Sequence, residues 1–378
     1  MCGFSGFAGD YKLDFDRMMT LKVMGDAMTH RGPDDHGEWY DETIGVGLSH
    51  RRLSVLDLSP EGKQPMISAS GRYVIAYNGE VYNFEELRRE LTFSGAEEKV
   101  WRGHSDTEVV LSAIEHFGIK NAIERFIGMF SLAVVDRHEK RLHLVRDRLG
   151  IKHLYYGMQK DVFVFGSELK ALRSLPFFQG TINRKALTQF LRYNCVPAPH
   201  SIYEGVSKLL PGHLLTVDIS NHTAVLEGSK PYWSARQVAE NGLANPFKGS
   251  ERQAIDKLHG ILSESVRMRM VSDVPLGAFL SGGFDSSMVV ALMQAQNHAP
   301  VKTFTIGFNE QEYDEAPHAK KVAKHLGTDH TELYVSPKEA IDVIPRLPML
   351  YDEPFSDSSQ IPSFLISQLA RQSVTVCL

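Results

Sequence analysis

The sequence predicts two domains of different class, a layered α+β domain over residues 2–176 and an α/β domain over residues 251–378. The first prediction rests on short β-branched and aromatic runs, which turn formers separate and two helical patterns interrupt. The second rests on strand and helix patterns that alternate, as in a parallel sheet with helices on both faces. Between the two, residues 177–250 are rich in proline and glycine, which predicts a connector with short strands.

Four runs in the first domain have the composition of strands and are bounded by turn formers. The polar run Arg137–Lys140 between two of them predicts a hairpin connection. One helix is expected after Asn83, where Glu86 three residues later suggests a capping box. Another is expected over Thr107–Phe117, with Asp106 as its N-cap. The four predicted strands cover residues 72–77, 128–136, 141–146 and 161–166.

In the second domain the hydrophobic period changes to that of a helix. Ala254, Leu258, Ile261, Leu262 and Val266 fall on one helical face. After this helix the pattern alternates between buried strands and helices, which favours a parallel sheet. Strands are expected over 274–280, 301–308, 330–335 and 373–378, and helices over 286–296, over 314–326 and twice more before residue 373.

Composition excludes several classes of partner. The net charge of -5 and the pI near 6.4 give no reason to expect nucleic acid or an anionic membrane. Cys2, Cys195 and Cys377 are too few and too scattered for a disulfide framework or a zinc site. The first residues lack the pattern of a signal peptide, and no run approaches the ~20 apolar residues of a membrane helix. The sequence is therefore expected to be cytoplasmic.

Cys2 follows the initiator methionine directly. Removal of Met1 would place a thiol and a free α-amino group on one residue. The amine has an ordinary pKa of ~7.7–8 and the thiol one of ~8.5, so the amine can take the thiol proton near neutral pH. The alternative is that a cysteine stands at position 2 by accident.

Four further polar segments have both a functional and a structural interpretation. His30–Asp34 is a compact polar turn, and Arg51 and Arg52 are adjacent charges that solvent alone could satisfy. Asn78–Glu80 follows a strong strand, where an asparagine amide and a backbone N–H can hold an oxyanion, or form a hairpin turn. Ser105–Glu108 opens a helix and contains an ordinary N-cap candidate. Each segment alone is better explained by structure than by function.

Together and in this order, MCGFSGF, HRGPDD, SHRRLSVLD, YNGEVYN and HSDTE resemble the class II glutamine amidotransferases, which are N-terminal-nucleophile hydrolases. Arg146–Ile151 and Phe165–Ala171 resemble the asparagine synthetase branch of that group. The resemblance implies a layered αββα sandwich. It also implies that Cys2 attacks the glutamine side-chain amide, and that Asn78 with Gly79 forms the oxyanion hole.

The resemblance assigns three more residues to glutamine. Arg52 should bind the α-carboxylate, for which a planar guanidinium suits better than a lysine. Glu80 and Asp106 should bind the α-ammonium. The neighbouring Arg51 receives no role.

A serine- and glycine-rich turn, Ser281–Ser287, follows a buried strand and opens a helix. Its N–H and O–H donors can hold an anion, although plain helix capping explains the pattern equally well. It lacks the Gly-Lys-Ser/Thr ending of a Walker A loop. It resembles the pyrophosphate loop of ATP pyrophosphatases, which implies ATP and Mg2+ as cofactors and Asp285 as a metal ligand. The implied ATP-binding residues are Leu280, Ser281, Gly282, Gly283, Asp285, Ser286, Ser287 and Ile306.

Two other segments match the asparagine synthetase family without a clear role. They are Tyr313–Glu315, which a helix N-cap would also explain, and Glu353–Ser359. In this family a further serine-glycine-acidic loop and a long helical region normally follow the strand matched by Val374–Leu378. The sequence stops at Leu378, so we expect glutamine hydrolysis without completed amide synthesis.

The resemblance implies that ammonia from glutamine reacts with a carboxylate that ATP has activated. Aspartate, giving asparagine with AMP and pyrophosphate, is the expected acceptor. Another carboxylate, such as a sugar uronate of surface polysaccharides, stays open, and so does a non-catalytic scaffold that kept the fold. The expected partners are the small molecules glutamine, aspartate or another carboxylate, and ATP, with neither nucleic acid nor membrane. Similar enzymes are usually homodimers.

Overall fold

The computed structural model describes residues 1–9, 15–93, 100–308 and 314–378 and divides the chain into two compact units. Unit 1 comprises Met1–Ala244 together with Asp352–Phe355. Unit 2 comprises Asn245–Tyr351 and Ser356–Leu378.

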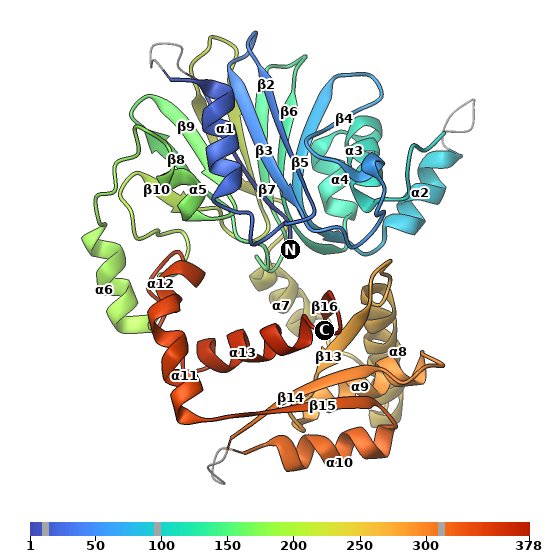
Figure 1. The fold of residues 1–378 in the computed structure, drawn as a ribbon. Helices are drawn as coiled ribbons and strands as arrows, with labels where there is room; N and C mark the ends of the chain where they lie inside the picture. The colour runs from blue at the N-terminus through green and yellow to red at the C-terminus, as the bar shows by residue number, and fades with distance from the viewer. Residues whose placement is uncertain (10–14, 94–99, 309–313) are drawn as a thin grey trace. The chain divides into compact units, whose positions relative to one another are not determined.

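Within the described residues, unit 1 contains two six-stranded antiparallel sheets (Figure 1). The first sheet has the strand order β10-β8-β9-β1-β3-β2, and the second has the order β12-β11-β7-β6-β5-β4. The strands of the first are β1 (Gly3–Ala8), β2 (Asp35–Asp41), β3 (Val46–Arg52), β8 (Tyr155–Gln159), β9 (Val162–Gly166) and β10 (Val206–Lys208). Those of the second are β4 (Met66–Ile67), β5 (Tyr73–Val81), β6 (Gly128–Asp136), β7 (Arg141–Arg146), β11 (His213–Asp218) and β12 (Val225–Pro231).

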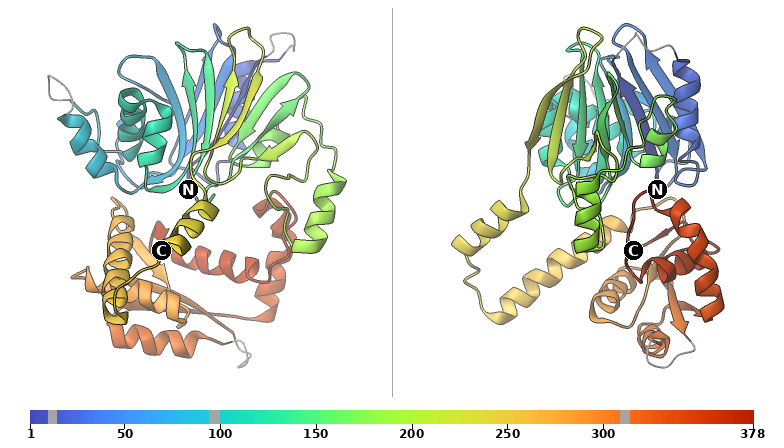
Figure 2. Two further views of the ribbon diagram at one scale, coloured as in Figure 1. Left: turned by 180° about the vertical axis from the view of Figure 1, so that it is seen from behind. Right: turned by 90° about the vertical axis from the view of Figure 1, so that its left-hand side faces the viewer.

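The two sheets stack face to face with a shared core (Figure 2). Val46 and Leu48 contribute from one sheet, and Ala76 and Val135 from the other. Helices α1 (Arg17–Asp26) and α5 (Leu169–Arg173) pack against the outer face of the first sheet, and α3 (Asp106–Phe117) packs against the second. The predicted αββα sandwich is therefore confirmed. The remaining helices are α2 (Phe84–Thr92), α4 (Ile119–Arg125), α6 (Arg184–Tyr193) and α7 (Ala235–Ala244).

Both helix starts predicted in this unit need a correction. Asn83 makes no side-chain cap bond, because its Oδ1 accepts the N–H of Ile127 (2.9 Å) and its Nδ2 donates to the carbonyl of Arg125 (3.1 Å). The N-cap of α3 is Ser105, whose Oγ accepts the N–H of Glu108 (3.4 Å). Asp106 is thereby free to bind elsewhere.

Unit 2 is built around a parallel sheet with the order β15-β14-β13-β16. Val290 and Met293 of α9, with Ala319 of α10, cover one face, and Ala370 of α13 covers Phe304 on the other. The predicted α/β class is confirmed. In the described chain no helix is both long and apolar enough to cross a membrane. The elements are α8 (Glu251–Arg269), β13 (Leu276–Phe279), α9 (Phe284–Ala295), β14 (Lys302–Phe308), α10 (Ala316–Leu326), β15 (Asp329–Val335), α11 (Pro337–Val343), α12 (Leu347–Leu350), α13 (Gln360–Ala370) and β16 (Val376–Cys377).

Candidate functional site

Cys2 lies immediately before β1, beside the end of β3. Its Sγ accepts the N–H of Leu53 at 3.4 Å and lies 3.6 Å from the carbonyl oxygen of the same residue. Burial raises the pKa of the Cys2 thiol, and the nearby Asp106 carboxylate acts in the same direction. The N–H of Leu53, the N-terminal ammonium and Arg52 oppose this rise. The thiol is therefore protonated at neutral pH until a base removes its proton.

The N-terminal amine, which Met1 carries in this chain, lies in surroundings that disfavour its charge. Its pKa is lowered from 8.0 to about 6, with desolvation as the largest cause; Arg31 and Lys152 act in the same direction, and Cys2 and Glu80 oppose them. At neutral pH an amine with this pKa is mostly a free base. The environment at this end of β1 therefore suits an amine that accepts a proton.

Asn78 and Gly79 lie within β5, opposite Ser131 and Phe130 of β6. The alternative of a hairpin turn at this point is therefore wrong. A Cβ at position 79 would lie 2.2 Å from the carbonyl oxygen of Met129, so only glycine fits. The Asn78 side chain is 1% exposed, and neither its Oδ1 nor its Nδ2 has a hydrogen-bond partner in the described structure.

The Gly79 N–H points away from β6. Phe130 opposite donates its N–H to Asp147 Oδ2 and accepts from the Asp147 N–H, so its polar groups face β7. In an antiparallel ladder such a residue does not bond the residue across from it. The flanking Tyr77 and Val81 N–H groups point the same way as that of Gly79 and bind the side chains of Gln64 (2.7 Å) and Asp106 (3.0 Å). Side-chain ligands thus replace a neighbouring strand along this edge of β5.

Arg52, the last residue of β3, is 5% exposed. Its guanidinium donates to the carbonyls of Leu56, Asp57 and Ser59, the last at 2.9 Å. A guanidinium has five N–H groups, so these contacts hold its orientation and leave donors for a ligand. A Cβ at Gly62 would lie 1.9 Å from a terminal nitrogen of Arg52, which explains the glycine there.

Asp106 is buried, and its Oδ2 accepts the Tyr77 O–H at 2.7 Å and the Val81 N–H at 3.0 Å. Burial raises the pKa of Asp106, against these hydrogen bonds. The partners on this oxygen are neutral, so a cation near it would remove much of the cost of burying the charge. Glu80 on β5 is half-buried and lies close enough to the N-terminal amine to raise its pKa.

In unit 2, Leu280–Gly283 joins β13 to α9, and the helix begins at Phe284, two residues earlier than predicted, so that Asp285, Ser286 and Ser287 lie in its first turn. Gly282 has a φ of +81°, and a Cβ there would lie 2.8 Å from the Ala319 nitrogen. Gly283 is the N-cap of α9 and makes no side-chain cap bond. Ser281 Oγ lies 2.9 Å from Ser286 Oγ, while Ser287 Oγ is buried without a partner in the described structure. The helix start therefore presents backbone and hydroxyl donors that an anion can use.

A cavity of about 160 Å3 lies beside this turn. Thr305 and Glu315 are among its polar lining groups, and the apolar lining includes Phe279 and Ile366. Of the residues predicted to bind ATP, it is lined by Leu280, Ser281, Ser286 and Ile306.

Asp285 is exposed in the first turn of α9. Among the described residues no three His, Cys, Asp or Glu side chains form a metal cluster. Mg2+ commonly uses one or two protein carboxylates together with substrate phosphates. The single carboxylate at a phosphate-type turn fits a Mg2+ ion that arrives with a nucleotide.

The sequence matches two protein families, the glutamine amidotransferase domain over residues 1–233 and asparagine synthase over residues 257–378. It is 32% identical to a putative glutamine-hydrolysing asparagine synthetase 2 of Methanocaldococcus jannaschii, over 100% of this chain and 73% of the relative. The chain belongs to the family of glutamine-hydrolysing asparagine synthetases.

Other members of this asparagine synthetase family are longer than the chain. It is 33% identical to glutamine-hydrolysing asparagine synthetase 1 of Bacillus subtilis, over 100% of this chain and 57% of that protein. It is 30% identical to the amidase chry2 of Gibberella zeae, over 87% of this chain and 50% of the relative. The chain thus spans 57% of the first of these two relatives and half of the second.

Sequence reasoning missed several residues that contact the candidate glutamine site in unit 1. Arg31 Nε donates to the carbonyl of Cys2 at 2.8 Å, yet only the motif around it was noticed. Gln64 and Gly62 contact β5 and Arg52 from a loop that no motif covered. Lys152 is buried near the N-terminal amine, and its Nζ lies 2.9 Å from Met1 Sδ. A glycine or glutamine in a loop gives no signal in one sequence.

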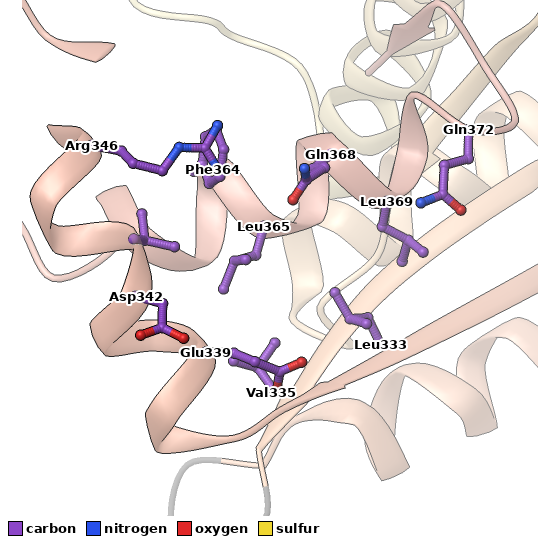
Figure 3. Close-up of a pocket in the computed structure, with 11 residues that line it drawn as sticks. Leu333, Val335, Glu339, Asp342, Arg346, Phe364, Leu365, Gln368, Leu369 and Gln372 are labelled. Carbon is purple, nitrogen blue, oxygen red and sulfur yellow. The ribbon is translucent and has the colours of Figure 1, made fainter. Parts of the chain in front are cut away.

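One of the two remaining family segments contributes Glu315 to the lining of the cavity beside the start of α9. Tyr313 lies outside the described residues. Glu315 is the N-cap of α10 but makes no side-chain cap bond, while Asp314 Oδ1 accepts the N–H of Ala316 at 3.2 Å. Asp352–Phe355 packs within unit 1. A larger cavity of about 310 Å3 between β15, α11 and α13 contains none of the predicted ATP residues (Figure 3).

Proposed function

We propose that the chain hydrolyses glutamine at Cys2 and binds ATP at Ser281–Ser287, as parts of a glutamine-dependent amide synthesis in which aspartate is the acceptor. The observation that carries the first part is the buried, unpartnered side-chain amide of Asn78 beside the outward N–H of Gly79. A buried polar group without a partner is costly, and a ligand that supplies the partner recovers that cost.

Catalysis begins with proton transfer from the Cys2 thiol to the α-amine of the same residue once Met1 has been removed. The surroundings that lower the pKa of the Met1 amine at this end of β1 should act in the same direction on the Cys2 amine, which supports its role as base. The thiolate attacks the side-chain carbonyl carbon of glutamine and forms a tetrahedral intermediate. The protonated amine then gives its proton to the leaving nitrogen, ammonia departs, and water hydrolyses the thioester.

Asn78 Nδ2 and the Gly79 N–H bind the oxyanion of the tetrahedral intermediate. Fixed donors in a buried site stabilise this charge without having to reorganise. Arg52 binds the α-carboxylate of glutamine with the donors that its carbonyl contacts leave free. The buried carboxylate of Asp106, with Glu80, binds the α-ammonium.

In unit 2 the adenosine of ATP occupies the cavity bounded by Leu280 and Ile306, and the phosphates bind at the start of α9. Asp285 would hold Mg2+, which supplies charge neutralisation of the departing pyrophosphate. The backbone donors around Gly283 and the hydroxyls of Ser286 and Ser287 orient the phosphates. The carboxylate attacks the α-phosphate to give an acyl-AMP, and ammonia displaces the AMP.

Glutamine hydrolysis by Cys2→Ala tests the first half of the proposal. Glutamate release by purified protein is expected to fall at least ~10³-fold, because the nucleophile is lost. Cys195→Ala is the matched control, since Cys195 is a half-buried free thiol elsewhere in the unit. Glutamate release by Cys2→Ala at the parental rate would remove Cys2 from the mechanism.

The acceptor is tested by supplying ATP, glutamine and one carboxylate at a time and detecting the amide by mass spectrometry. Aspartate is expected to be the substrate that yields an amide and AMP. The protein should be the full-length gene product, because the relatives extend beyond the part matched here. Amidation of a sugar uronate in preference to aspartate would overturn the acceptor.

A further inference from the structure

Four side chains of alternating charge form a row of ion pairs that begins at the backbone carbonyl of Cys2. The members of this row are Arg31, Glu168, Lys170 and Asp352. Arg31 Nε donates to the Cys2 carbonyl at 2.8 Å, and its Nη1 donates to Glu168 Oε1 at 2.8 Å. Lys170 Nζ donates to the other Glu168 oxygen at 2.7 Å. Lys170 also lies 3.0 Å from Asp352 Oδ1. Each of these four charged side chains thus contacts the next, and none is among the residues assigned to glutamine above.

Asp352 is held firmly in this row. Its Oδ2 accepts the Leu169 N–H at 2.6 Å, so both carboxylate oxygens are occupied. Glu353 beside it accepts the Ile202 N–H at 2.8 Å and pairs with Lys208 at 2.5 Å. Asp352–Phe355 belongs to unit 1, although the residues on either side of it belong to unit 2.

The members of the row are poorly exposed. The side-chain exposures are 16% for Arg31, 11% for Glu168, 21% for Lys170 and 10% for Asp352. Water and salt screen buried pairs weakly, so a change in one charge is felt by the next. Burial would raise the pKa of Glu168, but His30, Arg31 and Lys170 outweigh it and hold the pKa well below its usual value. Glu168 is therefore charged and depends on these cations.

The row ends at the backbone of the proposed nucleophile. Cys2 immediately precedes β1, and its carbonyl oxygen accepts the Arg31 Nε–H at the end of the pairing between β1 and β3. The Arg31 side chain also packs on Gly3, where a Cβ would lie 3.0 Å from Arg31 Cδ. The contact with Glu168 Oε1 holds the Arg31 side chain in this conformation, and Lys170 binds the other carboxylate oxygen of Glu168. Without Asp352, the Lys170 ammonium would lose one of the two carboxylates that fix its position, so it would hold Glu168, and through Glu168 the Arg31 side chain, less rigidly.

We propose that Asp352 is a positioning residue for the glutaminase reaction, acting on Cys2 through Lys170, Glu168 and Arg31. This inference rests on the proposed function. Because the row reaches the backbone of the nucleophile, loss of Asp352 should lower the rate of glutamine hydrolysis rather than weaken glutamine binding. Arg31, the first of the four, reaches Cys2 through the backbone carbonyl of that residue. A small displacement of a nucleophile is enough to slow the reaction strongly.

The test is steady-state glutamine hydrolysis by Asp352→Asn, which keeps an oxygen for the Leu169 N–H but loses the charge. We expect kcat to fall roughly tenfold while KM changes less than about twofold. Lys170→Gln breaks the same link from its other side and should give the same defect, should Asp352→Asn fail to fold. Asp342→Asn is the control, since Asp342 pairs with exposed Lys338 on α11 outside the row.

A double-mutant cycle distinguishes positioning from a general loss of stability. Asp352→Asn combined with Glu168→Gln should be no slower than Glu168→Gln alone, because both break one path. Parental kcat in folded Asp352→Asn or Lys170→Gln, a defect confined to KM, or an additive loss in the double variant would each overturn the inference. If the parent released no glutamate, the proposed function itself would fall, and the inference with it.

Discussion

At position 78 an asparagine side chain is buried in β5 with neither polar atom bonded in the described structure. Its cost to the folded protein is offset only when a ligand supplies the partner. Of the neighbouring backbone N–H groups, those of Tyr77 and Val81 donate to the side chains of Gln64 and Asp106, while that of Gly79 points away from β6. This edge of β5 therefore leaves a side-chain amide and a backbone N–H for a ligand, as the proposed oxyanion hole requires.

Asn78→Ala is expected to lower kcat for glutamine hydrolysis by about 10²- to 10³-fold, since one oxyanion donor is lost. KM should change much less, because the oxyanion exists only after attack. The measurement is glutamate release under saturating glutamine. Asn121→Ala on the exposed surface of α4 is the control. An unchanged kcat would show that Asn78 does not hold the oxyanion.

Gly62→Ala is expected to raise KM for glutamine roughly 10- to 100-fold, the loss typical of a charged hydrogen bond. The new Cβ would displace the end of the flexible Arg52 side chain from its carbonyl contacts, so some stability should also be lost with these hydrogen bonds. Gly180→Ala, where nothing lies within 4 Å of the added carbon, is the matched control. A parental KM in Gly62→Ala would show that Arg52 does not bind the α-carboxylate of glutamine.

The pH dependence follows from the N-terminal amine. Burial lowers the pKa of the Met1 amine at this end of β1 to about 6, and we expect the α-amine of the processed Cys2, in the same surroundings, to be shifted in the same direction. Because the base must be unprotonated to act, kcat/KM should be full at neutral pH and fall only at acidic pH. An acid limb near 8, the value of an ordinary α-amine, would contradict the buried base.

At the scale of elements, strands with strong alternation were predictable, whereas the caps were not. The runs that became β5, β6, β7 and β9 bury apolar side chains in one core, so their pattern fixes their class. Asn83 and Asp106 both look like N-caps in the sequence. The structure uses Asn83 for Ile127 and Asp106 for Tyr77, contacts between residues far apart in the chain. No local rule contains such contacts.

Gly282→Ala tests the turn between β13 and α9. The φ of +81° and the 2.8 Å approach to the Ala319 nitrogen make a side chain costly, by about 1–3 kcal/mol of stability of unit 2. Binding of Mg-ATP, measured by calorimetry, should weaken at least tenfold, since the turn presents the phosphate donors. Gly260→Ala in α8, where the added carbon meets nothing, should bind as the parent does. Equal binding of Mg-ATP by both variants would show that the nucleotide does not bind at this turn.

At the scale of the whole molecule, the two fold classes were predictable because hydrophobic period changes from 2 to 3.6 along the chain. The motifs named Cys2 and the turn at Ser281, but not the supporting contacts. Arg31, Gly62 and Gln64 act through neighbours brought close only by folding. The membership of Asp352–Phe355 in unit 1 is another such feature, since its sequence neighbours belong to unit 2.

The two proposed reactions use separate units, so their losses should be separable. Asp285→Ala is expected to weaken Mg-ATP binding and leave glutamate release at the parental rate. Cys2→Ala should show the reverse. Both variants are measured in the same two assays, calorimetry with Mg-ATP and glutamate release. A single variant that abolished both would contradict the assignment of each reaction to its own unit.

Intact-protein mass spectrometry after an acid quench with glutamine tests the nucleophile most directly. The expected result is a chain without Met1 that carries a glutamyl group on Cys2, because the thioester forms only on the processed residue. The Cys2→Ala variant should carry none. A glutamyl group on another residue, or turnover by a chain that keeps Met1, would contradict the proposed nucleophile and its base.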